Sequence, residues 1–393
     1  MSGPGAAAAA PAARILVVDD NEMNRDMLAR RLVRQGYAVD TAVNGRQALE
    51  RGRAGSYDLL LLDVMMPELD GRQVLAQWMG DDHLRNTPVV MISAADETEI
   101  VAHCIELGAD DYLPKPFNPV VLQARVGASL EKKRLRDRER LHAESLEREL
   151  EIGRRIQATF LPEALPEPPG WEIAALFEPA RQCAGDFYDA FALSGGRIAL
   201  AIADVCDKGV GAALFMALFR SLLRSTAEAA AADADAATIV RRAVVGTNDY
   251  IARTHGRANM FATLFFAVAD AATGELRFVN GGHEAPLLLA PSGDVAAELA
   301  PTGPAVGMLP DSRFAVGAAA IAPGQTLFAY TDGVTDAKGR DGFFGRDRLL
   351  ALIGGGVSSA SGLLERLGEG VRSHVGEAER FDDLTALAVR RTA

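Results

Sequence analysis

Several polar residues in the first third of the chain have side chains suited to receiving a phosphoryl group, and each follows a short apolar run. They are Asp19, Asp20, Asp63, Ser93 and Lys115. A carboxylate can accept a phosphoryl group only where a divalent cation and a fixed positive charge neutralise the incoming negative charge. Asp19 and Asp20 are suited to hold Mg²⁺, and Asp63 to share that ion and act as the nucleophile. Lys115 supplies the fixed charge, and the Ser93 hydroxyl can bind a phosphoryl oxygen.

The elements that must position these residues can be read from the apolar pattern of residues 14–128. Short apolar runs alternate with amphipathic stretches such as 24–35 and 97–107. This alternation predicts a doubly wound α/β domain whose parallel sheet is covered on both faces. Ligand sites in such sheets lie outside the carboxyl ends of the strands, so all five residues are expected in one cleft.

The motifs VVDDN, LLLLDVMMPELDG, VVMISA and GADDYLPKPF resemble those of the CheY-like receiver family, which has a flavodoxin-like fold. The resemblance implies that Asp63 is the phosphoacceptor, supplied by a sensor histidine kinase or a phosphotransfer protein. It assigns Mg²⁺ binding to Asp20, Asp63 and the Met65 carbonyl with help from Asp19, switch positions to Ser93 and Tyr112, and a cis bond between Lys115 and Pro116. A receiver fold that has lost phosphorylation is the alternative.

Residues 129–160 are dense in Arg, Lys and Glu and have apolar residues at roughly helical intervals. The heptad pattern is imperfect, because Gly153 and several charges fall on any seam. The segment is therefore either a solvated connecting helix or a coiled coil that makes the chain a homodimer. Its place between two domains favours the dimer slightly.

Aspartates beside glycines or at strand ends mark the third region, residues 161–393. The informative residues are Asp186, Asp189, Asp204, Asp207, Asp332, Asp382 and Asp383. A single such residue is usually a solvated turn or cap, but a buried cluster of unpaired carboxylates is costly and implies cations. Oxygen ligands favour Mg²⁺ or Mn²⁺, and two such ions can activate a shared water for attack on a phosphate. The region contains neither a CxxxxxR loop nor a GxSxG elbow that would supply a covalent nucleophile.

Short alternating runs and long Ala/Leu-rich helical patterns, notably 211–232 and 236–252, make this region α+β. The motifs AGDFYD, ADVCDKGVGAALFM, NGGHEAPLLL, YTDGVTDA and FDDLTALAV resemble the SpoIIE-like branch of the protein phosphatase 2C (PPM) superfamily over about residues 154–391. The resemblance implies a β-sandwich flanked by helices and a metal-dependent serine/threonine phosphatase.

By position, that resemblance assigns two Mn²⁺ or Mg²⁺ ions to the catalytic residues Asp186, Asp204, Asp332 and Asp382 and to the Val205 carbonyl. The branch commonly acts on anti-sigma-factor antagonist (STAS) proteins, so such a phosphoprotein is the expected substrate. Two departures stand out: Ala184 replaces the first residue of a common Gly-Gly-Asp, and Asp207 stands where Gly is frequent. Whether Asp382 or Asp383 binds metal stays open, as does the choice between a supporting role at the metal and a capping role for Asp189.

Length and composition set the class of molecule. The chain has 393 residues, a net charge of −12 and three cysteines that form no CxxC pair. Acidity disfavours nucleic acid and membrane surfaces as partners, and the cysteines fit the cytoplasm. Residues 1–13 are expected to be a disordered tail, and no run of about 18 apolar residues predicts a membrane span.

The multidomain prediction is a response regulator in which phosphorylation of Asp63 acts through residues 129–160 on the phosphatase, in a direction left open. A non-catalytic, phosphorylation-gated scaffold that binds a phosphoprotein is the alternative. A DNA-binding regulator is disfavoured by the acidity and by the lack of a helix-turn-helix pattern.

Overall fold

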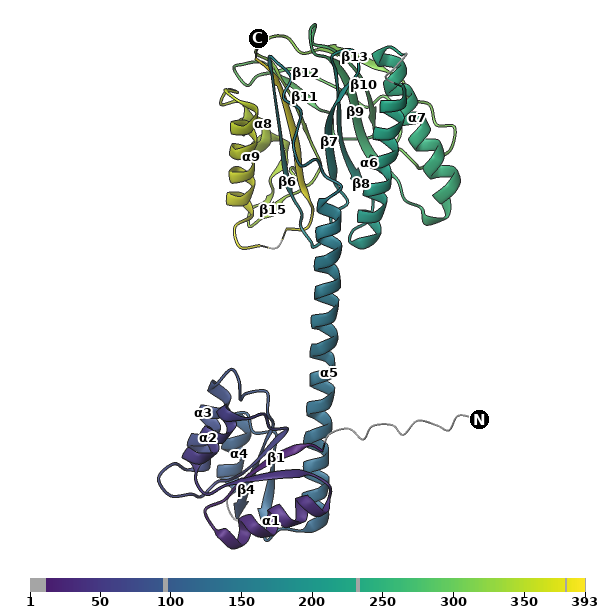
Figure 1. Cartoon of the computed structure of the whole chain (residues 1–393). Coiled ribbons are helices and arrows are strands. Elements are labelled where there is room, and N and C mark those ends of the chain that lie inside the picture. The colour runs from purple at the N-terminus through teal and green to yellow at the C-terminus, as the bar shows by residue number, and fades with distance from the viewer. Residues whose placement is uncertain (1–11, 95–97, 231–233, 379, 393) are drawn as a thin grey trace, which may run out of the picture. The chain divides into compact units, whose positions relative to one another are not determined.

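The computed structural model describes residues 12–94, 98–230, 234–378 and 380–392. Most of the predicted N-terminal tail, residues 1–11, lies outside the described residues. The chain divides into two compact units, Met1–Ser145 and Leu146–Ala393, and each is described by itself (Figure 1).

The first unit is built on a five-stranded parallel sheet of order β2-β1-β3-β4-β5. Its strands are β1 (Arg14–Val18), β2 (Ala38–Ala42), β3 (Leu59–Asp63), β4 (Val89–Ala94) and β5 (Asp111–Lys115). Its helices are α1 (Glu22–Arg34), α2 (Gly45–Ala54), α3 (Gly71–Gly80), α4 (Thr98–Glu106) and the first part of α5 (Pro119–Ala158). This is the strand order of flavodoxin-like folds, so the predicted architecture is confirmed.

Alternation along the strands explains why both faces of this sheet are covered. Leu60 and Leu62 pack into a core with Trp78 of α3, whereas Leu59 and Leu61 pack on the opposite face with Leu28 of α1. Successive side chains of a strand point to opposite faces, and fully apolar strands therefore need helices on both sides.

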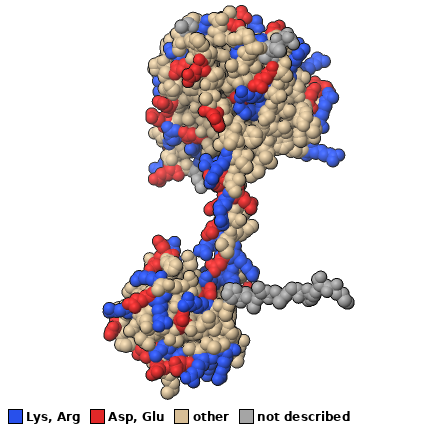
Figure 2. All heavy atoms as spheres, in the orientation of Figure 1, with Lys and Arg blue, Asp and Glu red and all other residues tan. Residues whose placement is uncertain are grey.

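A single helix, α5, runs from Pro119 to Ala158, so the expected boundary at 128/129 falls inside it. Its exposed apolar side chains are those of Leu135, Leu141, Leu146, Ile152 and Ile156. Charged pairs one turn apart, such as Arg154 with Glu151, occupy other positions. Figure 2 shows basic and acidic side chains interleaved along this segment.

The second unit contains two five-stranded sheets. The first has the order β13-β10-β9-β8-β7, with β13 (Gly317–Ala320), β10 (Glu275–Gly281), β9 (Ala262–Asp270), β8 (Arg197–Val205) and β7 (Phe187–Leu193). The second has the order β12-β11-β14-β17-β6, with β12 (Val295–Glu298), β11 (Leu287–Leu289), β14 (Thr326–Tyr330), β17 (Leu384–Arg391) and β6 (Trp171–Glu178). Small elements complete the unit: β15 (Lys338–Gly339), β16 (Gly342–Phe343) and the 3₁₀ helix η1 (Gly256–Ala258).

Three apolar layers hold this unit together. The sheets pack face to face through residues such as Leu200, Phe265 and Leu387. The outer face of the first sheet is covered by α6 (Val210–Ala230) and α7 (Ala236–His255), and that of the second by α8 (Gly345–Ile353) and α9 (Ala360–Val375) (Figure 1). The predicted sandwich flanked by helices is confirmed.

Among the described helices, α6 is long and apolar enough to cross a membrane by length and composition. Its residues Met216, Phe219 and Leu223, however, are buried in the core that α6 shares with α7 and the first sheet. Apolar length in this helix is therefore explained by packing.

Candidate functional site

The first acidic site lies at the carboxyl end of the parallel sheet. Asp19 and Asp20 follow β1, and Asp63 ends β3. One ligand oxygen from each of the three lies within 4.8 Å of the others. The Nζ atom of Lys115, at the end of β5, lies 2.7 Å from Asp63 Oδ2 and 3.2 Å from Asp19 Oδ2. The strand-end rule thus brings three acids and a cation together, a donor set that suits Mg²⁺.

Burial dominates the electrostatics of this site. Removal from water raises the pKa of Asp63 to about 6, the Asp19 charge adds to the rise, and the hydrogen bond from Lys115 opposes it. The pKa of Lys115 is raised by its hydrogen bond to Asp63 and by both carboxylates, although burial alone would lower it. The ammonium is therefore firmly held at the acceptor carboxylate.

The remaining residues expected at a receiver site lie in β4, in β5 and just after β3 and β5. Ser93 is buried in β4, next to β5. Met65 is 59% exposed, and its backbone N–H bonds the Asp63 carboxylate. Tyr112 is 39% exposed, with the Arg125 guanidinium 5.8 Å from its ring centre. The Lys115–Pro116 bond is cis, as the resemblance implied.

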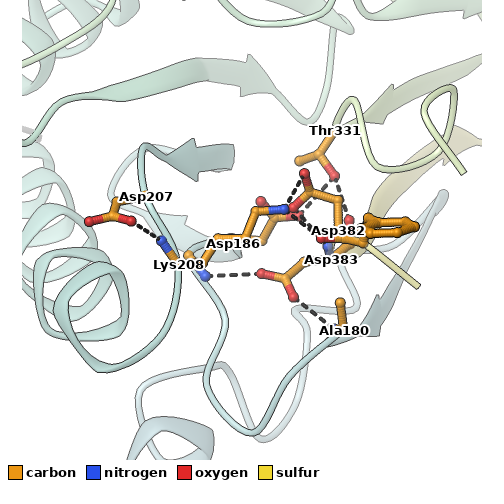
Figure 3. A network of polar contacts seen from close by, with 9 residues as sticks. Ala180, Asp186, Asp207, Lys208, Thr331, Asp382 and Asp383 are labelled. Carbon is orange, nitrogen blue, oxygen red and sulfur yellow. Dashed lines mark hydrogen bonds and ion pairs between the residues drawn. The ribbon is translucent and has the colours of Figure 1, made fainter. Parts of the chain in front are cut away.

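The second acidic site draws its carboxylates from both sheets of the sandwich. Asp186 directly precedes β7 and Asp204 lies in β8, whereas Asp332 follows β14 and Asp382 precedes β17. Figure 3 shows Asp186, Asp382 and Asp383 side by side with Thr331 and Lys208. Segments almost 200 residues apart thus meet at one end of the sandwich.

Two buried hydroxyl groups fix Asp186. Its Oδ2 atom accepts hydrogen bonds from Thr331 Oγ1 at 2.8 Å and from Thr385 Oγ1 at 2.5 Å. Burial, and then repulsion from Asp204, hold the pKa of Asp186 well above its usual range despite these bonds. These threonines were missed in the sequence because only the pairing of β14 with β17 brings both to Asp186.

Negative charge remains poorly compensated across the site. Burial raises the pKa of Asp204 to about 7, with further repulsion from Asp332 and Asp382. The pKa of Asp332 is also raised, first by burial and then by Asp382. Groups that repel one another in this way favour the binding of cations.

The two neighbouring aspartates, Asp382 and Asp383, have different contacts. Both oxygens of Asp383 accept backbone N–H groups, from Ala180 at 2.8 Å and Gly185 at 3.0 Å. Asp382 instead faces the acidic group, where its Oδ2 lies 2.8 Å from Lys208 Nζ (Figure 3). This arrangement favours Asp382 as a ligand and Asp383 as the residue that shapes the loop before Asp186.

The residues present fit divalent ions in chemistry and in space. A Cβ at Gly185 would lie 2.7 Å from the Val205 carbonyl oxygen, so glycine keeps that expected ligand open. Among the described residues, however, only the receiver trio brings three acidic ligand atoms within 4.8 Å of one another. The carboxylates of the second site are gathered but spaced apart, as mutual repulsion requires.

A glutamine of α5 also supports this site. Gln157 is buried, and its amide pairs with both backbone groups of Ala184: Nε2 donates to the carbonyl at 2.6 Å, and Oε1 accepts the N–H at 3.0 Å. Ala184 lies two residues before Asp186. The last turn of α5 is therefore hydrogen-bonded to the loop that carries a candidate ligand.

Several neighbouring residues have structural roles. Asp189 is buried in β7 and forms ion pairs with Arg220 at 3.0 Å and with the partly exposed Arg224 at 3.4 Å, both on α6. The buried His283 ring bonds Thr263 at 2.8 Å, and burial lowers its pKa to about 4. Cys183 is buried, and Cys206 accepts the Phe261 N–H.

Two family models match the chain. The family model of Stage II sporulation protein E (SpoIIE) matches residues 194–392, about half of the chain. The chain belongs to the SpoIIE family. The response regulator receiver domain matches residues 15–127, ahead of the SpoIIE domain.

Individual relatives match parts of the chain. Protein IcfG of Synechocystis is 45% identical over 263 residues, covering 62% of this chain and 41% of its own length. ResD of Bacillus subtilis, a transcriptional regulatory protein, is 42% identical over 117 residues, covering 30% of this chain and 48% of its own length. The chain spans between 41% and 53% of the length of the first curated relatives it matches.

A solved structure shares the fold of the second unit. The SiaA-PP2C domain of Pseudomonas aeruginosa superposes with a TM-score of 0.53 at 23% identity, covering 63% of this chain and 98% of that domain. The chain is thus a receiver domain joined to a SpoIIE domain, and the fold of its second unit is that of the SiaA-PP2C domain.

Proposed function

We propose that this chain is a metal-dependent phosphatase of phosphoserine and phosphothreonine proteins. Two Mn²⁺ or Mg²⁺ ions would be held by Asp186, Asp204, Asp332, Asp382 and the Val205 carbonyl. The observation that carries the proposal is the gathering of four carboxylates from two sheets, with raised pKa values at three of them. Among the described residues, Lys208 is the one cation paired with this group.

The chain's own residues would prepare this site. When bound, the ions supply a water of lowered pKa and hold the oxygens of the phosphate. Thr331 and Thr385 orient Asp186, and Asp383 fixes the loop before it. No covalent nucleophile is required.

The direct test is hydrolysis of para-nitrophenyl phosphate by the full chain with added Mn²⁺. Asp332→Asn should abolish turnover and the rise that Mn²⁺ causes in the unfolding temperature of the SpoIIE domain. Asp341→Asn, at an exposed aspartate, is the matched control and should keep both. If the wild type turns over neither this ester nor phosphoproteins with any divalent metal, the chain is a phosphorylation-gated scaffold instead.

Regulation would begin at Asp63. A sensor histidine kinase or phosphotransfer protein would phosphorylate Asp63, with Mg²⁺ held by Asp19, Asp20, Asp63 and the Met65 carbonyl. The acidic trio, of which Asp19 and Asp63 are buried, and the Lys115 ammonium support this role. The signal would pass through α5, which is continuous from Pro119 to Ala158. Equal turnover by the wild type and Asp63→Ala, each treated with a phosphodonor, would contradict this coupling.

The cellular setting follows from the family. We propose a STAS-type anti-sigma-factor antagonist as the substrate, in the cytoplasm, without nucleic acid or membrane as partner. The exposed apolar residues of α5 support a homodimer through residues 129–160. Sedimentation of the wild type and of Leu146→Asp tests the dimer: the variant should be a monomer, and a monomeric wild type would exclude it.

A further inference from the structure

An open cavity of about 700 Å³ lies in the second unit beside the acidic group. Two loops and a helix line it: residues 179–182 before β7, residues 380–381 before β17, and Arg154 of α5. The same two loops carry Asp186 and Asp382 a few residues further along the chain. The cavity and the candidate metal site therefore share their supporting segments.

Hydrogen bonds join the cavity wall directly to the acidic group. The Ala180 N–H bonds Asp383, and the Phe381 carbonyl accepts a bond from Lys208, which also pairs with Asp382 (Figure 3). A chain that places its phosphate at the four aspartates would thus extend its neighbouring residues over this wall.

The cavity is basic, although the chain has a net charge of −12. Arg154, Arg181 and Arg380 line it. Arg154 pairs with Glu151 and Arg380 with Glu178.

Among the described residues, the carboxylates paired with these arginines are too few to neutralise them. Glu151 also forms an ion pair with Arg155, and Glu178 also forms one with Arg372. The guanidinium groups therefore outnumber the carboxylates that pair with them. Arg181 is exposed and has no ion pair within the described part of the chain. A free guanidinium can take a carboxylate in bidentate fashion.

An aromatic side chain completes the surface. Phe381 is 69% exposed, next to Asp382 in sequence. Exposed aromatic and Arg side chains together are typical of residues that dominate protein recognition. The wall therefore offers positive charge with one apolar contact.

We propose that this cavity docks an acidic segment of the substrate phosphoprotein, adjacent to its phosphoserine or phosphothreonine, with Arg181 as the main charged contact. This inference rests on the proposed function and adds a substrate preference to it. Attraction between the basic cavity and acidic residues would raise the affinity for such segments over neutral ones.

The test compares two phosphoserine peptides of one sequence, one with Glu and Asp flanking the phosphoserine and one with Gln and Asn there. They are hydrolysed by the Mn²⁺-loaded full chain, with para-nitrophenyl phosphate as the reference substrate. The wild type should prefer the acidic peptide, with a lower KM. Arg181→Glu should raise that KM about tenfold and remove the preference. Arg242→Glu, at an exposed arginine of α7, makes the same charge change away from the cavity and should keep the preference.

A binding measurement separates this inference from the phosphatase assignment. A fluorescent acidic peptide without phosphate should bind the wild type more tightly than Arg181→Glu in anisotropy titrations, and added salt should weaken that binding. If no substrate is hydrolysed but this difference holds, the phosphatase assignment fails and the docking surface stands. Equal KM values for both peptides, equal binding by both proteins, or a preference for single-stranded nucleic acid over the acidic peptide would overturn the docking proposal.

Discussion

The receiver and the SpoIIE domain both gather aspartates, but they compensate the charge differently. In the receiver, Lys115 contacts both Asp19 and Asp63. In the SpoIIE domain, Asp186 and Asp204 have no cationic partner among the described residues, and only hydroxyl groups bond Asp186 besides Asp204. The receiver lysine contacts both buried carboxylates of its site, whereas Lys208 of the SpoIIE domain pairs with Asp382 and leaves Asp186 and Asp204 without a counter-charge among the described residues.

The largest expected effect is on the uncompensated site. Asp204→Asn removes a carboxylate that Asp332 and Asp382 repel, so the metal-free SpoIIE domain should unfold at a higher temperature. The same change should lower Mn²⁺-dependent turnover about a thousandfold, because a ligand is lost.

Tryptophan fluorescence can follow the unfolding of each domain separately, because each domain contains one of the two tryptophans. Trp78 lies in the receiver and Trp171 in the SpoIIE domain, and both are buried. Trp78→Phe therefore leaves fluorescence that follows the SpoIIE domain alone. The matching receiver variant is Asp63→Asn, followed through Trp78 in a chain that also carries Trp171→Phe. Its metal-free unfolding temperature should rise less than that of Asp204→Asn, because Asp63→Asn also removes the ion-pair partner of Lys115. A fall in the metal-free unfolding temperature of Asp204→Asn would contradict the contrast.

The pH dependence should differ between the domains when metals are chelated. A carboxylate with a raised pKa stabilises the fold below its unfolded pKa and loses that contribution as pH rises through the folded value. Asp63, at about 6, is largely ionised by pH 6.5, whereas Asp204, at about 7, is not. Between pH 6.5 and 8 the SpoIIE transition should therefore fall by about 2–4 °C while the receiver transition stays nearly level.

Titration of the buried His283 does not contribute to the change in stability between pH 6.5 and 8. His283, with a pKa lowered to about 4, destabilises the fold only as pH falls below about 6.5, where the unfolded ring gains a proton. In Asp204→Asn, the unfolding temperature of the SpoIIE domain should change less with pH above pH 6.5 than it does in the wild type. A receiver curve as steep as the SpoIIE curve would refute the difference in compensation.

The same contrast explains what the sequence could predict. In the receiver, strands that end at one edge of a parallel sheet bring Asp19, Asp63 and Lys115 together, so a rule of topology was enough. In the SpoIIE domain the motifs indicated the aspartates, but their supports depend on pairings such as β17 with β6, about 200 residues apart. No local pattern indicates that Thr385 bonds Asp186.

The direction of the Asp189 side chain could not be predicted from the sequence either. Asp189 was expected near the metals or at a helix cap, yet it points toward α6 and pairs with Arg220. The sequence does not give that direction. Alternation along β7 shows which residues share a face of the sheet, but it does not show which of the two faces α6 covers. Tertiary packing decided the role of this aspartate.

Gln157 in the last turn of α5 is hydrogen-bonded to the loop that leads to Asp186 in the SpoIIE domain. Gln157→Ala leaves the backbone N–H and carbonyl of Ala184 buried without their amide partner, which should cost about 1–3 kcal/mol in unfolding free energy. Because Asp186 follows two residues later, Mn²⁺ should also bind more weakly. Calorimetric titration of Mn²⁺ measures the second effect, and Gln157→Glu, which sets a carboxylate oxygen against the Ala184 carbonyl oxygen in place of the donor, should weaken Mn²⁺ binding at least as much as Gln157→Ala. Unchanged Mn²⁺ affinity in both variants would limit Gln157 to a purely structural role.

The smallest expected effect comes from backbone strain beside each acidic site. Glu68 follows the receiver's Asp63 with a φ of 67°, and Asp207 follows Asp204 with a φ of 73°. Left-handed backbone costs an ordinary side chain about 1 kcal/mol, but a short Asp can offset part of that by local hydrogen bonding, as Asp207 does with the Lys208 N–H at 2.8 Å. Glu68→Gly should therefore raise the unfolding free energy of the receiver by about 1 kcal/mol, and Asp207→Gly that of the SpoIIE domain by about half as much. Denaturant titrations read through Trp78 and Trp171 compare the two directly, and a larger gain at Asp207 would mean that its side chain adds repulsion to the neighbouring acidic group instead of relieving its own turn.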